Sequence, residues 1–302
     1  MAHAPIALFV HDRLAHAQRT VASLLRNPGA ALSDLYVFSD GPRTPQKQAA
    51  VDSVRRFVSG ISGFRSVRIV RRAVNYGLAR SIIEGVSQVL AESDRLIVLE
   101  DDMVTSPHFL AYMNEALDRF RDDDRVVSVH GYVYPVRADL PEAFFLQGAD
   151  CWGWGTWRRG WSVFNPDGRA LLDELTRRKL LHAFDFNASH PYSDMLREQI
   201  AGRNDSWAIR WYASAFLADK LTLYPGRSLV HNIGNDSSGT HAVDTDTHDA
   251  RLSGTPIDLR RVPVAPSGQA RAAFEAFFRS SSGGLLQRAV RMARQTVARM
   301  AR

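Results

Sequence analysis

Residues 95–103 read RLIVLEDDM, and this stretch decides how the rest of the chain is interpreted. Four apolar residues (96–99) are followed directly by Glu100, Asp101 and Asp102. An uninterrupted apolar run of this length predicts a strand that is covered on both faces. Adjacent carboxylates repel one another, and the end of a buried strand is a poor place to solvate them. The stretch therefore predicts a buried strand whose end has a specific use for negative charge.

Short β-rich runs alternate with helical stretches through the first 130 residues. Besides residues 96–99, such runs occur at 6–10, 35–39, 67–70 and 126–130. The helical stretches between them span residues 16–27, 45–60, 78–93 and 106–120. Strands that alternate with helices usually pair in parallel through right-handed crossovers. The pattern predicts a doubly wound α/β layer.

The pattern changes after Gly131. Helical spacing returns at 168–183 and 191–219, and a short strand is expected at 222–225. Pro, Gly, Ser and charged residues with weak periodicity predict mostly loop or extended structure over 242–283. We therefore divide the chain into an α/β half (1–130), a second half of the same domain (131–241), an extended loop region (242–283) and a C-terminal helix (284–302).

The composition limits the cellular setting. The chain has 302 residues, a net charge of +6 and one cysteine, Cys151. A single cysteine cannot form an internal disulfide, and the apolar run 5–10 is too short for a signal peptide, so we expect a cytoplasmic protein. The positive charge suggests an anionic partner, either a phosphate compound, a nucleic acid or a lipid surface. No nucleic-acid-binding motif appears, so we expect no nucleic acid.

Residues 284–302 contain five arginines and no acid. Their apolar residues fall on one helical face and most of the arginines on another, which predicts a basic amphipathic helix of the kind that lies on an anionic membrane. Such contact would place the protein peripherally at the inner face of the cytoplasmic membrane. The alternative is that the apolar face packs on the rest of the chain.

The acidic triplet is a candidate metal site. In open parallel sheets, ligands bind beyond the carboxyl ends of the strands, which is where Glu100, Asp101 and Asp102 are expected. Mg²⁺ takes one or two protein carboxylates and completes its shell with water and substrate phosphate. The alternative is that the acids cap the helix at 106–120, although Ser106 and Pro107 already supply a cap and a first-turn proline.

A hydrophobic strand that ends in Glu-Asp-Asp after three strand–helix units resembles the DXD-type motif of GT-A-fold glycosyltransferases. The likeness is greatest to the N-acetylglucosaminyltransferase I type and extends to family 2-like bacterial sugar transferases. It covers about residues 5–241. The resemblance implies a GT-A fold, which is Rossmann-like with a mostly parallel sheet flanked by helices. It also implies a nucleotide-sugar donor and a divalent cation, Mn²⁺ or Mg²⁺, that Asp102 contacts.

The resemblance assigns the donor side residue by residue. Only the arginine of VHDR (10–13) matches the family, and Asp40 in FSDG (38–41) takes the place of an acid that contacts uracil. The segment NYGLARS (75–81) lies where the family lines the donor pocket. A plain turn at Asp40 and a solvated side chain at Arg80 are the alternatives. The implied donor-binding residues are Arg13, Asp40, Asn75, Arg80, Glu100 and Asp101.

The second half is expected to hold the acceptor and the catalytic base. Asp205 in GRNDSWAIRWYASAF (202–216) resembles the family's base, with a helix N-cap as the alternative. His241 fits a late histidine that many GT-A enzymes use on the metal. The stretch DCWGWGTWRRGW (150–161) would contact sugar, or else form an aromatic core, and its Arg158 and Arg159 would meet an anionic acceptor. The implied acceptor residues are Asp150, Trp152, Trp154 and Trp207.

These assignments predict a metal-dependent, inverting glycosyltransferase that moves a sugar from a UDP-sugar to a hydroxyl of a glycan or lipid-linked acceptor. A nucleotidyltransferase is the first alternative, but VHDRLAHAQRT (10–20) lacks the glycine-rich loop that such enzymes usually carry. The second alternative is a non-catalytic protein that binds glycan or nucleic acid.

Overall fold

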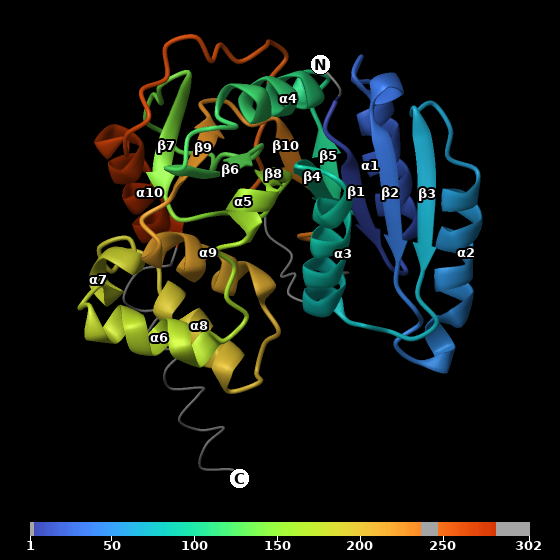
Figure 1. The fold of residues 1–302 in the computed structure, drawn as a ribbon, viewed down its shortest axis with the longest axis horizontal. Helices are drawn as coiled ribbons and strands as arrows, with labels where there is room; N and C mark the ends of the chain where they lie inside the picture. The colour runs from blue at the N-terminus through green and yellow to red at the C-terminus, as the bar shows by residue number, and fades with distance from the viewer. Residues whose placement is uncertain (1–2, 237–246, 282–302) are drawn as a thin grey trace.

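The structure, a computed structural model, describes residues 3–236 and 247–281. Its first half contains a block of four parallel strands in the order β3-β2-β1-β4 (Figure 1). These strands are β1 (Ile6–Val10), β2 (Asp34–Ser39), β3 (Ser66–Arg71) and β4 (Arg95–Glu100). The helices that connect them are α1 (Leu14–Leu25), α2 (Gln48–Ser59) and α3 (Leu78–Glu92). Two short 3₁₀ turns, η1 (Ala30–Leu32) and η2 (Pro45–Lys47), precede β2 and α2. The predicted α/β layer is confirmed for this part of the chain.

The second half extends the same sheet to eight strands in the order β3-β2-β1-β4-β8-β6-β9-β7. The added strands are β6 (Val126–His130), β7 (Ala143–Gln147), β8 (Trp154–Trp157) and β9 (Leu221–Pro225). The sequence pattern predicted that β6 would continue the parallel block. Instead β8 lies between β4 and β6 and is antiparallel to both, while β6 pairs in parallel with β9. The aromatic stretch therefore supplies a central strand.

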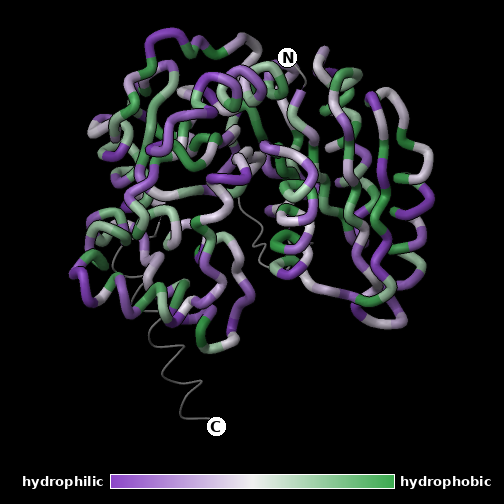
Figure 2. Tube along the Cα trace, in the orientation of Figure 1, coloured by the Kyte–Doolittle hydropathy of each residue, from purple (hydrophilic) through white to green (hydrophobic). Residues whose placement is uncertain are grey.

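The helices cover both faces of the sheet. Along β1, Ile6, Leu8 and Val10 pack under α1, α2 and α4 (Phe109–Arg119), whereas Ala7 and Phe9 pack under α3, α5 (Arg158–Trp161) and α9 (Trp207–Leu217). Hydrophobic residues follow the strands in Figure 2, and hydrophilic residues follow the outer turns of α2. The uninterrupted apolar runs of the sequence thus have the expected cause, since both sides of each central strand are buried.

A third apolar cluster joins the remaining helices to β7 and β9. These helices are α6 (Gly168–Arg177), α7 (Leu181–Phe184), α8 (Tyr192–Ile200) and α10 (Gly268–Ser281). Helix α10 differs from the loop expected for 242–283. Its buried Ala270, Ala273, Phe274 and Phe278 recur every three or four residues, and Ser267 Oγ accepts the N–H of Ala270 (3.2 Å). A cap and a helical period were therefore both present in the sequence.

A small antiparallel sheet positions the candidate site. Strand β5 (Met103–Thr105) follows the acidic triplet and pairs with β10 (Val230–Asn232), which brings the segment after residue 229 to the end of β4. Residues 284–302, and with them the predicted basic helix, lie outside the described residues. Within the described residues, the structure contains no helix of the length and apolarity that crossing a membrane requires.

Candidate active site

The acidic triplet forms a turn at the end of β4. Glu100 is the last residue of the strand, and Asp101 and Asp102 lie between β4 and β5. Helix α4 begins only after this second strand, and Ser106 Oγ accepts the backbone N–H of His108 just before the helix (3.2 Å). The acids are therefore separated from α4 by a strand, and the alternative that they cap this helix is wrong.

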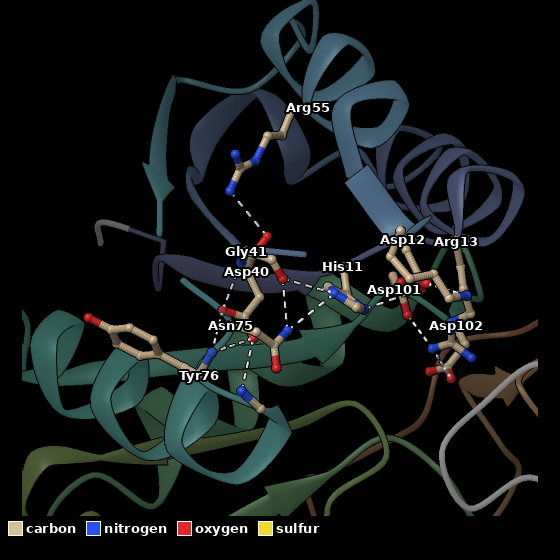
Figure 3. Close-up of polar contacts among 12 residues, drawn as sticks. His11, Asp12, Arg13, Asp40, Gly41, Arg55, Asn75, Tyr76, Asp101 and Asp102 are labelled. Carbon is tan, nitrogen blue, oxygen red and sulfur yellow. Dashed lines mark hydrogen bonds and ion pairs between the residues drawn. The ribbon is translucent and has the colours of Figure 1, made fainter. Parts of the chain in front are cut away.

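Arg13 is the cationic partner of two of these acids. Its Nη2 donates to Asp101 Oδ1 and to Asp102 Oδ2, the latter at 2.7 Å (Figure 3). Burial alone would lower the pKa of the Arg13 guanidinium, but the two carboxylates outweigh burial and raise that pKa. The arginine is therefore charged and held at the end of β1 by the acidic turn. The nucleotide contact that the resemblance implies for Arg13 remains a prediction.

One guanidinium does not balance three carboxylates. Burial, together with repulsion from Asp102 and Asp101, raises the pKa of Glu100. Burial also raises the pKa of Asp101, and Arg13 opposes this rise without cancelling it. The Oδ1 atom of Asp102 is buried and has no hydrogen-bond partner. The turn thus contains carboxyl groups whose ionised forms are destabilised by burial and mutual repulsion, together with an unused carboxylate oxygen.

A hard divalent cation fits this arrangement. Carboxylate oxygens are the ligands that Mg²⁺ and Mn²⁺ prefer. Among the described residues, no cluster of three or more His, Cys, Asp or Glu side chains is arranged to enclose an ion. A site with only one or two protein ligands is suitable for an ion whose other ligands are water and substrate phosphate. The second predicted ligand, His241, lies outside the described residues.

The segment after β10 forms the opposite wall of this site. The backbone N–H of Ile233 donates to the carbonyl of Asp102 (2.9 Å). A Cβ atom on Gly234 would lie 2.2 Å from Asp102 Oδ2, so a larger residue at 234 would displace the carboxylate. The backbone N–H of Gly234 donates to Asn232 Oδ1 (2.7 Å). The close packing fixes the orientation of Asp102.

Asp40 follows β2 at the same edge of the sheet. Its carboxylate accepts backbone N–H groups from Gly41 (2.9 Å), Tyr76 (2.9 and 3.0 Å) and Gly77 (3.0 Å) (Figure 3). These bonds tie the end of β2 to the loop between β3 and α3. The tether is a role that the sequence did not predict, while the contact of Asp40 with uracil remains a prediction.

Asn75 lies on the loop that Asp40 holds. Its Nδ2 donates to the carbonyl of Gly41 (2.8 Å) and lies 3.3 Å from His11 Nε2. The His11 ring also contacts Asp12, which pairs with Lys47 Nζ (2.8 Å). Asn75 thus lies beside Gly41 at the carboxyl edge of the sheet, and its predicted contact with the donor remains a prediction. His11 and Lys47 join it there, although sequence reasoning assigned neither of them a role.

Arg80 lies on the first turn of α3. It pairs with Glu84 (2.6 Å), and its guanidinium lies over the ring of Tyr76 at 3.9 Å. The Arg72 guanidinium also lies over the Tyr76 ring, 4.2 Å from its centroid. More than half of the Arg80 side chain is exposed, in line with the solvated alternative. The contact of Arg80 with the donor remains a prediction.

Asp205 lies at the start of α9, on the second half of the sheet. The helix N-cap is Ser206, whose side chain accepts the N–H of Ile209, so the alternative that Asp205 is the cap is wrong. The Asp205 carboxylate is 69% exposed and lies 3.5 Å from Arg210 Nη2. A Cβ atom on Gly77 would lie 4.0 Å from Asp205 Oδ2. The predicted base therefore faces the loop that Asp40 holds.

The tryptophans divide into two groups. Trp154 and Trp207 are 1% and 2% exposed, and their ring centroids lie 5.4 Å apart in the core between α3 and α9. Buried rings cannot stack on a sugar, so the acceptor role expected for these two tryptophans is wrong and the core alternative holds. Trp152 is half-buried, packs against Tyr132 and donates its backbone N–H to His130 Nε2 (2.9 Å).

Asp150 lies beside Trp152 in the loop that precedes β8. Its carboxylate accepts the N–H of Cys151 (2.8 Å) and lies 3.8 Å from His130 Nε2. Burial lowers the pKa of His130, although Asp150 opposes this effect, so the ring is neutral near pH 7. Within residues 3–236 and 247–281, the basic side chain at ion-pair distance from the Asp150 carboxylate is that of neutral His130. The acceptor role of Asp150 remains a prediction.

Arg158 and Arg159 do not reach this region. Arg158 donates to the carbonyls of Leu90, Ala91 and Ser93 at the end of α3. Arg159 donates to three carbonyls of residues 120, 121 and 126 around the end of α4. Both arginines neutralise helix C-termini, where the backbone carries partial negative charge. The expected contact with an anionic acceptor is therefore wrong.

Together, the parallel strands and the acidic turn at their carboxyl edge define an α/β enzyme of the GT-A type. The sequence profile described as glycosyl transferase family 2 matches residues 6–164, more than half of the 302-residue chain. The chain belongs to this family and is a glycosyltransferase. No curated protein shows a significant sequence match.

Several solved structures are similar at low identity. S. aureus TarS matches with 14% identity and a TM-score of 0.31, over 48% of this chain and 24% of TarS. The Pyrobaculum calidifontis mannosyltransferase PcManGT, in complex with GDP-Man and Mn²⁺, matches with 10% identity and a TM-score of 0.35, over 72% of this chain and 69% of its own. A candidate nucleotide-diphospho-sugar transferase from Desulfovibrio desulfuricans G20 matches with 12% identity and a TM-score of 0.32, over 55% of this chain and 68% of its own. At these TM-scores the likenesses carry no conclusion about this chain.

The tether through Asp40 predicts a stability effect without any ligand. In Asp40→Asn, the amide nitrogen cannot accept a backbone N–H, so at least one buried donor loses its partner. We expect the free energy of unfolding, measured by urea denaturation, to fall by about 1–3 kcal/mol. Asp52→Asn is the matched control, because Asp52 accepts only a surface hydrogen bond from Gln48 (2.9 Å). Equal stability of Asp40→Asn and the wild type would contradict the tether.

Proposed function

We propose that this glycosyltransferase moves a sugar from a nucleoside diphosphate donor, preferably a UDP-sugar, to a hydroxyl of a glycan or lipid-linked acceptor. The observation that carries the proposal is the buried, unpartnered Oδ1 of Asp102, in a turn where burial and mutual repulsion destabilise the ionised carboxylates. In this proposal Asp102 binds Mn²⁺ or Mg²⁺ together with the donor diphosphate. A bound cation would offset the charge that develops on the leaving diphosphate.

The residues around Asp102 have distinct parts in this proposal. Arg13 holds Asp101 and Asp102 in one orientation, and Glu100 and Asp101 lie within reach of the donor sugar. The nucleotide lies along the edge formed by Arg13, Asp40 and Asn75, with Arg80 at its rim. A carboxylate can accept the N–H of a uracil ring, which is the reason for proposing UDP. Because Asp40 already accepts three backbone N–H groups, Asn75 would share the contact with the uracil ring.

A nucleotide panel tests the donor and the cation. We expect UDP with Mn²⁺ to raise the melting temperature, because a ligand at a hundred times its Kd stabilises the fold by about 2.7 kcal/mol. GDP, CMP and dTDP, each with and without Mn²⁺, complete the panel. Asp102→Asn should lose the metal-dependent shift, while Asp94→Asn, an exposed aspartate just before β4, should keep it. A shift with another nucleotide would overturn UDP, and an unchanged shift in Asp102→Asn would overturn the metal assignment.

Asp205 is the base in this proposal. As the acceptor oxygen bonds to the anomeric carbon, its proton passes to the Asp205 carboxylate. The bond from that carbon to the diphosphate breaks, and the nucleoside diphosphate leaves with the electron pair. One displacement of this kind inverts the anomeric configuration. The exposure of Asp205 and its position opposite the loop held by Asp40 support this assignment.

Asp205→Asn should separate binding from transfer. A positioned general base typically contributes about 10²–10⁴-fold in rate, so we expect acceptor-stimulated release of nucleoside diphosphate to fall by at least about 100-fold. The nucleotide-induced melting shift should not change. Asp194→Asn is the control, because Asp194 is an exposed aspartate (72%) on neighbouring α8. Continued transfer by Asp205→Asn would show that the base lies elsewhere.

We further propose that the acceptor binds over Asp150 and Trp152. Asp150 combines a carboxylate that faces neutral His130 with a neighbouring half-buried indole. Sugars are commonly bound in this way, through hydroxyls that donate to a carboxylate and C–H surfaces that lie on an aromatic ring.

Asp150→Asn tests this acceptor position. Loss of hydrogen bonds to a charged group costs about 1.5–3 kcal/mol, so we expect the acceptor KM to rise by about 10-fold to 100-fold. The assay is diphosphate release with free oligosaccharides and polyprenyl-phosphate-linked sugars as acceptors. Asp139→Asn, in an exposed loop, is the control. An unchanged acceptor KM, or an equal loss of nucleotide binding, would contradict the acceptor position.

We propose that the enzyme works in the cytoplasm, at the inner face of the membrane. The proposal rests on the arginine-rich residues 284–302 and on the lipid-linked type of acceptor.

A further inference from the structure

A polar stripe runs along α1 beneath the acidic turn. Its members recur every three or four residues, a spacing that places them on one helical face: Arg13, His16, Thr20, Ser23 and Asn27. Thr20 Oγ1 donates to the carbonyl of Asp101 (2.7 Å). Ser23 Oγ accepts the N–H of Thr105 (2.9 Å), and Asn27 Nδ2 donates to Thr105 Oγ1 (3.3 Å). The stripe therefore fixes the backbone on both sides of Asp102.

His16 connects this stripe to a distant part of the chain. Its Nε2 lies 3.2 Å from the carbonyl oxygen of Ile233 and 3.1 Å from Asp236 Oδ2. A carbonyl and a carboxylate only accept hydrogen bonds, so Nε2 carries the proton. The His16 side chain is 13% exposed, which shields these contacts from water. Helix α1 thus holds the turn of residues 233–236 from one side.

The same turn packs against Asp102 from the other side. Ile233 donates its N–H to the carbonyl of Asp102 (2.9 Å), and the next residue is Gly234. A Cβ atom at Gly234 would lie 2.2 Å from Asp102 Oδ2 and 3.1 Å from Arg13 Nη1. Asp102 is therefore confined between Arg13 and this turn. Its free Oδ1 keeps one direction only while the turn stays in place.

We propose that His16 is a positioning residue for the cation and diphosphate site, acting by holding residues 233–236 against Asp102. This inference rests on the proposed function of Asp102. Side chains that orient the ligands of a metal typically change metal affinity by about 10–100-fold when they are lost. His16 itself contacts neither the proposed cation nor the reacting sugar.

Manganese binding measures this effect directly. We expect His16→Ala to weaken Mn²⁺ binding about 10-fold or more, as followed by electron paramagnetic resonance with Mn²⁺ alone and with Mn²⁺ plus UDP or GDP. His16→Gln should recover most of the affinity, because a glutamine amide can also donate to the carbonyl of Ile233. His108→Ala is the matched control: His108 Nε2 lies at the same 3.2 Å from a backbone oxygen, that of Gly254, away from the acidic turn.

Hydrogen exchange of the Ile233 amide provides a readout that needs no metal. That amide should exchange faster in His16→Ala than in the wild type, and His16→Gln should restore its protection. Unchanged Mn²⁺ affinity in His16→Ala, or unchanged exchange at Ile233, would overturn the positioning role. If Asp102→Asn binds Mn²⁺ like the wild type, the proposed function fails instead, and the Ile233 exchange still decides whether His16 holds the turn.

Discussion

The repulsion among three carboxylates at the end of β4 is the constraint on which the neighbouring structure depends. Glu100 ends a buried strand, and Asp101 and Asp102 follow where few water molecules can solvate them. Buried charges of one sign are costly unless cations or hydrogen bonds compensate them. Arg13 supplies one positive charge, and backbone and side-chain contacts from α1 and the segment after β10 hold the turn rigid. What remains is a cluster of carboxyl groups whose ionised forms a bound cation would stabilise.

The parts of the fold that local pattern specifies were predictable. Strand β1 (Ile6–Val10) and strand β6 (Val126–His130) have the predicted bounds, and the helices between the first strands begin and end within a few residues of prediction. The position of β8 was not predictable in this way. Its residues WGTW (154–157) have an aromatic and glycine composition that fits a loop, and only pairing with β4 and β6, far away in the sequence, makes them a central strand.

In the candidate site, too, local sequence patterns were informative and contacts between remote segments were not. Asp102 could be proposed as a metal ligand from the sequence because its own neighbours, an apolar run and two other acids, indicate its environment. The N–H groups that bind Asp40 and the Ile233 carbonyl that His16 contacts were missed because they are backbone groups of remote segments, and the residue type does not report an N–H or a carbonyl. For Arg158 the sequence suggested a contact that the structure does not contain. Its long cationic side chain is close in sequence to the predicted sugar site, but it donates hydrogen bonds to carbonyls at the end of α3. The polar residues along α1, by contrast, recur at a helical spacing that is visible in the sequence and indicates a polar face on this helix.

The loop between β3 and α3 borders both halves of the molecule. Asp40 holds the backbone of Tyr76 and Gly77, and Gly77 adopts a positive φ of 73° directly before α3. A side chain at Gly77 would be strained there, and its Cβ atom would come into ordinary contact with the carboxylate of Asp205, 4.0 Å from Oδ2. The loop that borders the proposed nucleotide position therefore also borders the proposed base. Because the Asp40 carboxylate at the end of β2 accepts the N–H groups of Tyr76 and Gly77, the parallel sheet fixes the position of this loop, and with it one border of both proposed positions.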